Sequence, residues 1–158
     1  MGETWREVSA EWMGDSAFIG RNTKGGSVQM GTLDGKPGVG PMELLLVGLA
    51  GCTGIDIVDI LIKKRQEVTG FTVKVRGKRR QEYPQIYTEI EVLYLLWGDN
   101  IEPRAVEHAI KLSEDKYCSA SAMLGKAAEI KSSYRILAPG EQVELEDDGT
   151  WISEKING

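Results

Sequence analysis

One long apolar segment, residues 42–66, limits what this chain can fold into more than any other feature of the sequence. Its longest run without a charge, 44–55, is 12 residues long and falls short of the roughly 20 residues that span a bilayer. Glu43 and Asp56 interrupt it further. Pro41 stands where the first turn of a helix tolerates proline. Because apolar side chains lie on most of its faces, we expect a buried, central helix in a soluble protein.

Three glycines recur every third residue in this segment, at Gly48, Gly51 and Gly54. Each costs a helix about 1 kcal/mol relative to alanine. Such a repeat is typical of a surface that another backbone approaches closely. Cys52 lies on this stretch of the helix.

The rest of the chain reads as alternating strands and helices. The expected elements are three strands of a meander at 5–13, 17–22 and 27–33, a hairpin of strands at 70–80 and 86–97, a helix at 103–116, a short helix from Cys118 and a strand at 129–137. This order predicts an α+β fold with the long helix packed against antiparallel sheets. We expect one domain over 1–137, followed by an acidic surface tail at 138–158.

The hairpin carries a basic cluster, residues 74–80, opposite Glu89 and Glu91 on the second strand. Paired strands use such opposite charges across a solvated face. We therefore interpret the cluster as a sheet face and not as an anion or nucleic-acid site.

Composition excludes several classes of function. The 158-residue chain has a net charge of −5, which argues against general nucleic-acid binding. It has two cysteines and a single histidine, His108, too few for the common structural zinc sites or a disulfide scaffold. Residues 1–14 hold no apolar core of the kind a secretory signal needs. We expect a cytoplasmic protein with no metal, no cofactor and no membrane partner, whose most reactive side chains are two thiols.

The two thiols have different settings. A free cysteine is most often a small buried hydrophobe, and that interpretation stays open for both. Cys118 stands where a helix begins, and helix N-termini lower the pKa of a thiol. Cys52 lies about three turns inside its helix, with Asp56 and Asp59 on the same side, and carboxylates raise the pKa of a thiol. The residues alone favour Cys118 as the more acidic thiol, so Cys52 needs a cation from another element.

Two motifs carry a family resemblance. The stretch GPMELLLVGLAGCT at 40–53 resembles the first cysteine motif of the OsmC/Ohr family, and DIVDILIKKR at 56–65 fits its OsmC-like branch. The stretch EDKYCSAS at 114–121 resembles the second cysteine site. The resemblance covers about 9–137. It implies an intertwined homodimer, with central buried helices packed against antiparallel sheets and the sites at the subunit interface.

The resemblance also implies a chemistry. A thiol peroxidase of this family reduces organic hydroperoxides: Cys52 would attack the O–O bond and become a sulfenate, and Cys118 would resolve it as a disulfide. A dithiol such as a lipoylated protein would then reduce the disulfide. The family holds its thiolate with an arginine from the N-terminal strands, for which we select Arg21; an exposed turn arginine is an equally open interpretation of this residue.

One departure from the family pattern stands out. The peroxidase branch places a glutamate ten residues before the first cysteine, where this chain has Met42. Glu43 faces about 180° away from Cys52 on a helix and lies about 14 Å from it along the axis, so we do not expect it to bond that thiolate. We interpret His108 as a surface residue. The alternative function is therefore a non-enzymatic dimeric module that binds a small apolar ligand or senses oxidants.

Overall fold

The computed structural model describes residues 4–143, which fall into two compact units, one up to Leu45 and one from Leu46. In the first unit, β1 (Val8–Gly14), β2 (Ala17–Asn22) and β3 (Ser27–Met30) form an antiparallel sheet in that order. A second pair of short strands, β4 (Thr32–Leu33) and β5 (Lys36–Pro37), follows. The expected meander is confirmed.

The third strand of the meander ends earlier than predicted, at a glycine. Gly31 has a φ of 78°, and a Cβ built on it would lie 2.1 Å from the carbonyl oxygen of Ser16. Only glycine fits both the backbone conformation and this close approach. The break separates β3 from β4, which the sequence pattern had run together.

Helix α1 (Pro41–Lys63) begins at the predicted proline. Its first turn is capped, because the Gly40 N–H donates to Glu43 Oε1 at 3.1 Å. In the second unit, one stripe of the helix, spaced every four residues, is buried: Leu49, Thr53, Ile57 and Leu61. The central helix is thus confirmed, but within this chain its burial is confined to that stripe. By length and composition alone α1 could also cross a membrane. A single helix of this kind is weak evidence for a membrane span, because the core helix of a soluble protein meets the same criteria.

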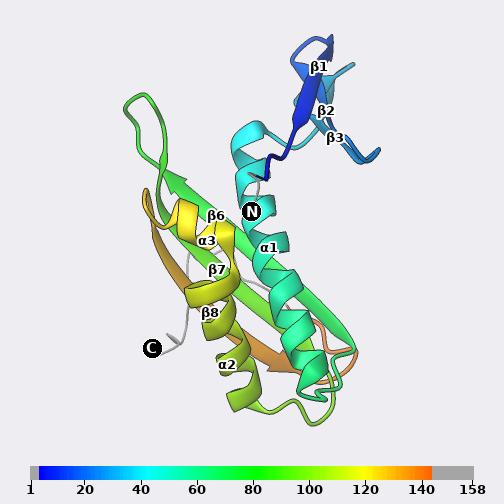
Figure 1. The fold of residues 1–158 in the computed structure, drawn as a ribbon, viewed down its shortest axis with the longest axis vertical. Helices are drawn as coiled ribbons and strands as arrows, with labels where there is room; N and C mark the ends of the chain where they lie inside the picture. Colours follow the sequence, from blue (N-terminus) through cyan, green and yellow to red (C-terminus); the bar gives the residue numbers. More distant parts are fainter. Residues whose placement is uncertain (1–3, 144–158) are drawn as a thin grey trace. The chain divides into compact units, whose positions relative to one another are not determined.

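The second unit is built on a sheet of β6 (Gly70–Arg79), β7 (Tyr87–Trp97) and β8 (Glu129–Leu137) in that order. Strands β6 and β7 form the predicted antiparallel hairpin. Strand β8 runs parallel to β7 because the chain crosses between them through α2 (Pro103–Leu112), the π-helical turn η1 (Ser113–Tyr117) and α3 (Ser119–Leu124). In Figure 1, the helices of this unit cover one face of the sheet. The α+β fold is confirmed, but this sheet is mixed and not antiparallel throughout as predicted, because β8 pairs with β7 in parallel.

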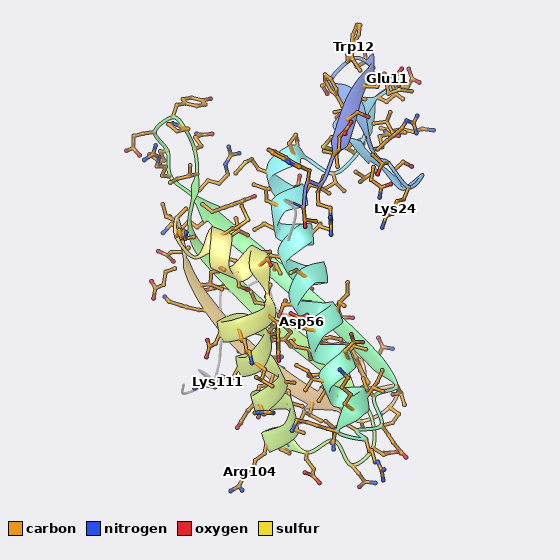
Figure 2. The ribbon with its side chains drawn as sticks, viewed as in Figure 1. Glu11, Trp12, Lys24, Asp56, Arg104 and Lys111 are labelled. Atoms are coloured by element: carbon orange, nitrogen blue, oxygen red, sulfur yellow. The ribbon has the colours of Figure 1, made fainter. Side chains whose placement is uncertain are left out.

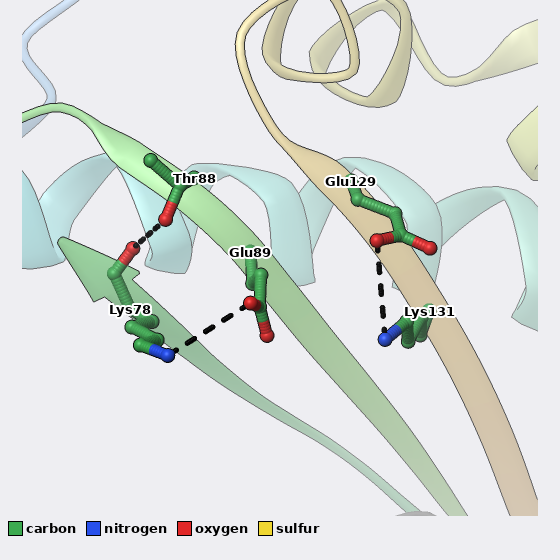
Figure 3. Close-up of polar contacts among 5 residues, drawn as sticks. All are labelled: Lys78, Thr88, Glu89, Glu129 and Lys131. Carbon is green, nitrogen blue, oxygen red and sulfur yellow. Dashed lines mark hydrogen bonds and ion pairs between the residues drawn. The ribbon is translucent and has the colours of Figure 1, made fainter. Parts of the chain in front are cut away.

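The charged side chains of the hairpin pair as predicted. Lys78 lies opposite Glu89, with Nζ 3.9 Å from Oε1 (Figure 3). Arg76 lies opposite Glu91 and forms an ion pair with it. The Thr88 hydroxyl also donates to the carbonyl oxygen of Lys78 at 3.3 Å. This confirms the basic cluster as one side of a cross-strand charge ladder.

The core of the second unit lies between the sheet and its helices. Its fully buried members include Ile90, Val92 and Leu96 from β7 and Val106 and Ile110 from α2. The expected tail is described only as far as residue 143. Its acidic residues Glu144, Glu146, Asp147 and Asp148 lie outside the described residues, so the tail and the domain bounds stay predictions.

Candidate active site

Two cysteines 66 positions apart in the sequence come together in the second unit. Cys52 lies in the fourth turn of α1, and Cys118 is the residue that caps α3. Both are free thiols, and they lie near enough for Cys52 to affect the pKa of Cys118. The fold therefore brings together the two thiols that the motifs single out.

Cys118 is the more enclosed of the pair. Its side chain is 3% exposed, whereas Cys52 is half-buried. The Ser121 backbone N–H donates to Cys118 Sγ at 3.3 Å, so the thiol sits at the start of α3 as predicted. Access from outside consequently favours Cys52 over Cys118.

The expectation that a position at a helix start lowers the pKa of Cys118 is wrong. Burial raises the pKa of Cys118 above its ordinary value, and the hydrogen bonds from Ser121, which lower it, do not compensate. The neighbouring Cys52 raises the pKa of Cys118 further. A helix of six residues offers a short dipole, and the desolvation of a buried thiolate outweighs it.

A chain of buried hydroxyls runs beside the thiols. The Thr53 hydroxyl, next to Cys52 in the sequence, lies 2.9 Å from the Tyr94 hydroxyl and 2.9 Å from Ser113 Oγ. Thr53 and Tyr94 are fully buried, as is Ser113. Because they are buried, these three hydroxyls have to find their hydrogen-bond partners within the protein.

Carboxyl groups terminate this chain at both ends. Ser113 Oγ donates to Asp56 Oδ2 at 2.9 Å, and the Tyr94 hydroxyl donates to Glu114 Oε1 at 2.8 Å. Ser132 on β8 also donates to Glu114 Oε1. We call Asp56, Ser113, Thr53, Tyr94 and Glu114 the hydroxyl chain. Figure 2 labels Asp56 on the part of α1 next to the turn that precedes α3.

The electrostatics of the hydroxyl chain follow from its burial. Burial raises the pKa of Tyr94, and the nearby Glu114 and Cys118 raise it further. Burial also raises the pKa of Glu114, although the hydrogen bonds from Ser132 and Tyr94 lower it, and the charge of Asp115 acts in the same direction as burial. A carboxyl and a phenol that both resist ionisation therefore lie close to the thiols.

The selected arginine lies in the other unit. Arg21 is an exposed residue of β2 and lines a hollow of about 480 Å³ with Val8, Val28 and Leu44, all in the first unit. Cys52 and Cys118 belong to the second unit. The role of Arg21 stays a prediction.

The remaining sequence expectations can be placed on α1 and α2. The carboxylate of Glu43 caps the first turn of α1, which agrees with the expectation that it does not serve Cys52. Met42 is half-buried. His108 is exposed on α2, as predicted for a surface residue. Within residues 4–143, no group of three or more metal-ligating side chains gathers.

Sequence reasoning missed the hydroxyl chain, although its members stand inside the quoted motifs. Thr53 closes the first motif and Glu114 opens the second. Tyr94 is a polar residue on the apolar face of a strand, and a buried tyrosine usually finds a partner for its hydroxyl. That combination is a signal for a buried polar contact, but it does not identify the partners.

Comparison with known proteins identifies relatives along most of the chain. A family model described as OsmC-like protein matches residues 33–133. The protein YhfA of Escherichia coli K12 is 36% identical over 132 residues, covering 84% of this chain and 98% of YhfA. Its name states no activity.

Solved structures give the same fold. A hypothetical protein from Aquifex aeolicus VF5 is 38% identical with a TM-score of 0.77, over 86% of this chain and 98% of that one. An organic hydroperoxide resistance protein, OsmC, from Legionella pneumophila has a TM-score of 0.62 at 11% identity, over 85% of this chain and 98% of that one. At that identity, the second likeness shows the fold alone.

Proposed function

This chain belongs to the OsmC-like protein family, and we propose that it is a cysteine-based peroxidase that reduces organic hydroperoxides. Proteins of the OsmC/Ohr family act on hydroperoxides and are often dimers. The observation that carries the proposal is that Cys52 and Cys118 lie near enough for Cys52 to raise the pKa of the Cys118 thiol. A disulfide requires two cysteines that are neighbours in the fold, and this pair meets that first condition.

The first step oxidises Cys52. Its thiolate attacks the O–O bond, an S–O bond forms, and the O–O bond breaks. The leaving alkoxide takes a proton and departs as an alcohol, so the hydroperoxide is reduced and Cys52 becomes a sulfenic acid. The greater exposure of Cys52 supports this assignment, because the oxidant has to reach the attacking sulfur.

The second step involves Cys118. Its thiolate attacks the sulfur of Cys52, the S–S bond forms, and the S–O bond breaks with loss of hydroxide, which takes a proton to become water. An external dithiol, itself oxidised to a disulfide, returns both cysteines to thiols. The burial of Cys118 supports the resolving role, because a sheltered thiol reacts with its neighbour before it reacts with solutes.

We propose that a second copy of this chain covers the outer side of α1. Val47, Ile55 and Ile62 are 54%, 67% and 65% exposed and lie within about 80° of one another around the helix. A Cβ added at Gly51, on the same stripe, or at Gly48 would meet no described atom within 4 Å. A soluble, cytoplasmic homodimer would bury this surface.

Arg21 remains our candidate for the cation that activates Cys52.

The test is turnover with purified protein. Cumene or tert-butyl hydroperoxide with a dithiol, lipoylated protein included, should be consumed by the wild-type protein and not by Cys52→Ser. Cys118→Ser should allow one oxidation but stop turnover. Absence of turnover in the wild type, or turnover that survives Cys52→Ser, would overturn the proposal.

A second candidate is a redox sensor or ligand-binding module of the same fold. Met42 at the position of the family's glutamate and the raised pKa of the Cys118 thiol both favour slow chemistry. A sensor would form the Cys52–Cys118 disulfide once with hydroperoxide and would not turn over with dithiol. A binding module would co-purify with an apolar ligand and form no disulfide.

A further inference from the structure

The hydroxyl chain has four hydrogen-bond contacts, but its three hydroxyls have only three hydrogens to donate. Three hydroxyls, on Thr53, Tyr94 and Ser113, make four contacts: two with each other and two with the terminal carboxyls. Each hydroxyl has one hydrogen to donate. With both carboxyls ionised, Tyr94 and Ser113 donate outward, and Thr53 can satisfy only one of its two neighbours.

The missing hydrogen is a proton on one of the carboxyls. We propose that Asp56 and Glu114 share a single proton through Thr53, Tyr94 and Ser113. If Glu114 holds it, each group donates to the next until Ser113 donates to Asp56. If Asp56 holds it, all four hydrogen bonds reverse direction. Both arrangements supply every contact with one hydrogen, so the proton can move between the ends without any heavy atom leaving its place.

The position of this chain connects it to the thiols. Asp56 lies one helical turn after Cys52, and Glu114 lies four residues before Cys118. The backbone N–H of Cys118 donates to the carbonyl oxygen of Ser113, a member of the chain, at 2.7 Å. Thr53 and Ser113 therefore join the segment that carries Cys52 to the turn that carries Cys118.

The shared proton lowers the negative charge around the thiols by one unit. Nearby carboxylates oppose the formation of a thiolate, so a pair with one charge opposes it less than a pair with two. The other titratable groups that act on this site are Asp115 beside Glu114, and Cys118, which acts on Tyr94. Burial of Glu114 supports the same protonation state. The proton count stands without the peroxidase chemistry; only its effect on Cys52 rests on the proposed function.

Infrared spectroscopy of the reduced protein in heavy water tests the proton directly. At neutral pH the wild type should show the band of a protonated carboxyl, and both Glu114→Gln and Asp56→Asn should lose it. The matched control is Glu107→Gln, because Glu107 accepts a hydrogen bond from Tyr134 at 2.7 Å on an exposed surface. The proposal is overturned if the wild type shows no such band, or if the band persists in Glu114→Gln.

A second comparison separates the hydroxyl chain from burial alone. Thr53→Val splits the chain into two halves, each with one hydroxyl and one contact, so no extra proton is required. The titration midpoint of the band should fall by about one pH unit, the worth of one neutral hydrogen bond. Ser113→Ala breaks the chain at another point and should act alike if Thr53→Val folds poorly. An unchanged midpoint in these variants would show that burial holds the proton and would refute sharing.

The effect on the thiols has its own readout. Alkylation of Cys52 by iodoacetamide at neutral pH should slow about threefold in Thr53→Val, equal to half a pKa unit. Adding Glu114→Gln to that variant removes the second charge and should restore the rate, while Tyr134→Phe should leave it unchanged. A rate in Thr53→Val equal to that of the wild type would contradict this consequence.

Discussion

Thr53→Val should destabilise the protein by about 1–2 kcal/mol, although it changes one atom of a residue that is 0% exposed. The hydroxyl of Thr53 makes two hydrogen bonds of 2.9 Å, and a neutral hydrogen bond contributes about 1 kcal/mol net. Tyr94 and Ser113 each keep a carboxyl partner in the variant, so neither is left without a hydrogen bond. The loss therefore stays near the sum of the two bonds.

Urea unfolding at a fixed protein concentration measures the change, because dimerisation would make stability depend on concentration. A fall in the unfolding midpoint with an unchanged slope reports a loss of stability. The double variant Thr53→Val/Tyr94→Phe should lose less than the two single variants together, by about 1 kcal/mol. Tyr134→Phe, which removes an exposed tyrosine–glutamate bond from the neighbouring strand, serves as the control.

Two results would refute this reasoning. One is a Thr53→Val protein as stable as the wild type, because the two contacts would then contribute nothing net. The other is full additivity of Thr53→Val and Tyr94→Phe, because residues that share a hydrogen bond are coupled.

Three further outcomes are expected. Burial raises the pKa of the Cys118 thiol, so as pH rises the unfolded chain loses this proton before the folded protein does. Thermal unfolding of the reduced protein should therefore show a loss of stability as pH rises above about 8.5. Cys118→Ser should remove this dependence of stability on pH. Ile57→Ala, at a fully buried position of α1, should cost about 2–5 kcal/mol in urea unfolding. Arg76→Met should cost less than about 1 kcal/mol and leave hydroperoxide turnover unchanged, because the ion pair of Arg76 with Glu91 lies on a half-exposed sheet face.

The sequence was most informative where local chemistry decides the structure. Proline at position 41 and the alternation in the hairpin predicted α1 and the pairing of β6 with β7 to within a few residues. The charges of Lys78 and Glu89 predicted their cross-strand pairing. These features act over a few residues or one turn, so a single sequence carries them.

The sequence was least informative where distant segments meet. Cys118 stands at the start of a helix, a position that by itself lowers the pKa of a thiol. Its pKa is nevertheless raised because the fold buries it, and burial depends on residues far along the chain. The contacts of Thr53 with Tyr94 and Ser113 join positions 41 and 60 residues apart. A pattern can indicate that a buried hydroxyl needs a partner, but only the fold identifies which one.

The most direct test of the central claim is mass spectrometry of the intact, reduced protein after one equivalent of an organic hydroperoxide. The wild type should lose two hydrogens, and digestion should yield a peptide pair linked through Cys52 and Cys118. Cys118→Ser should instead carry a sulfenic acid at Cys52 that dimedone traps. Oxidation without that linked pair, or a sulfenic acid at Cys118 in Cys52→Ser that forms as fast as the wild-type disulfide, would contradict the assignment of the two thiols.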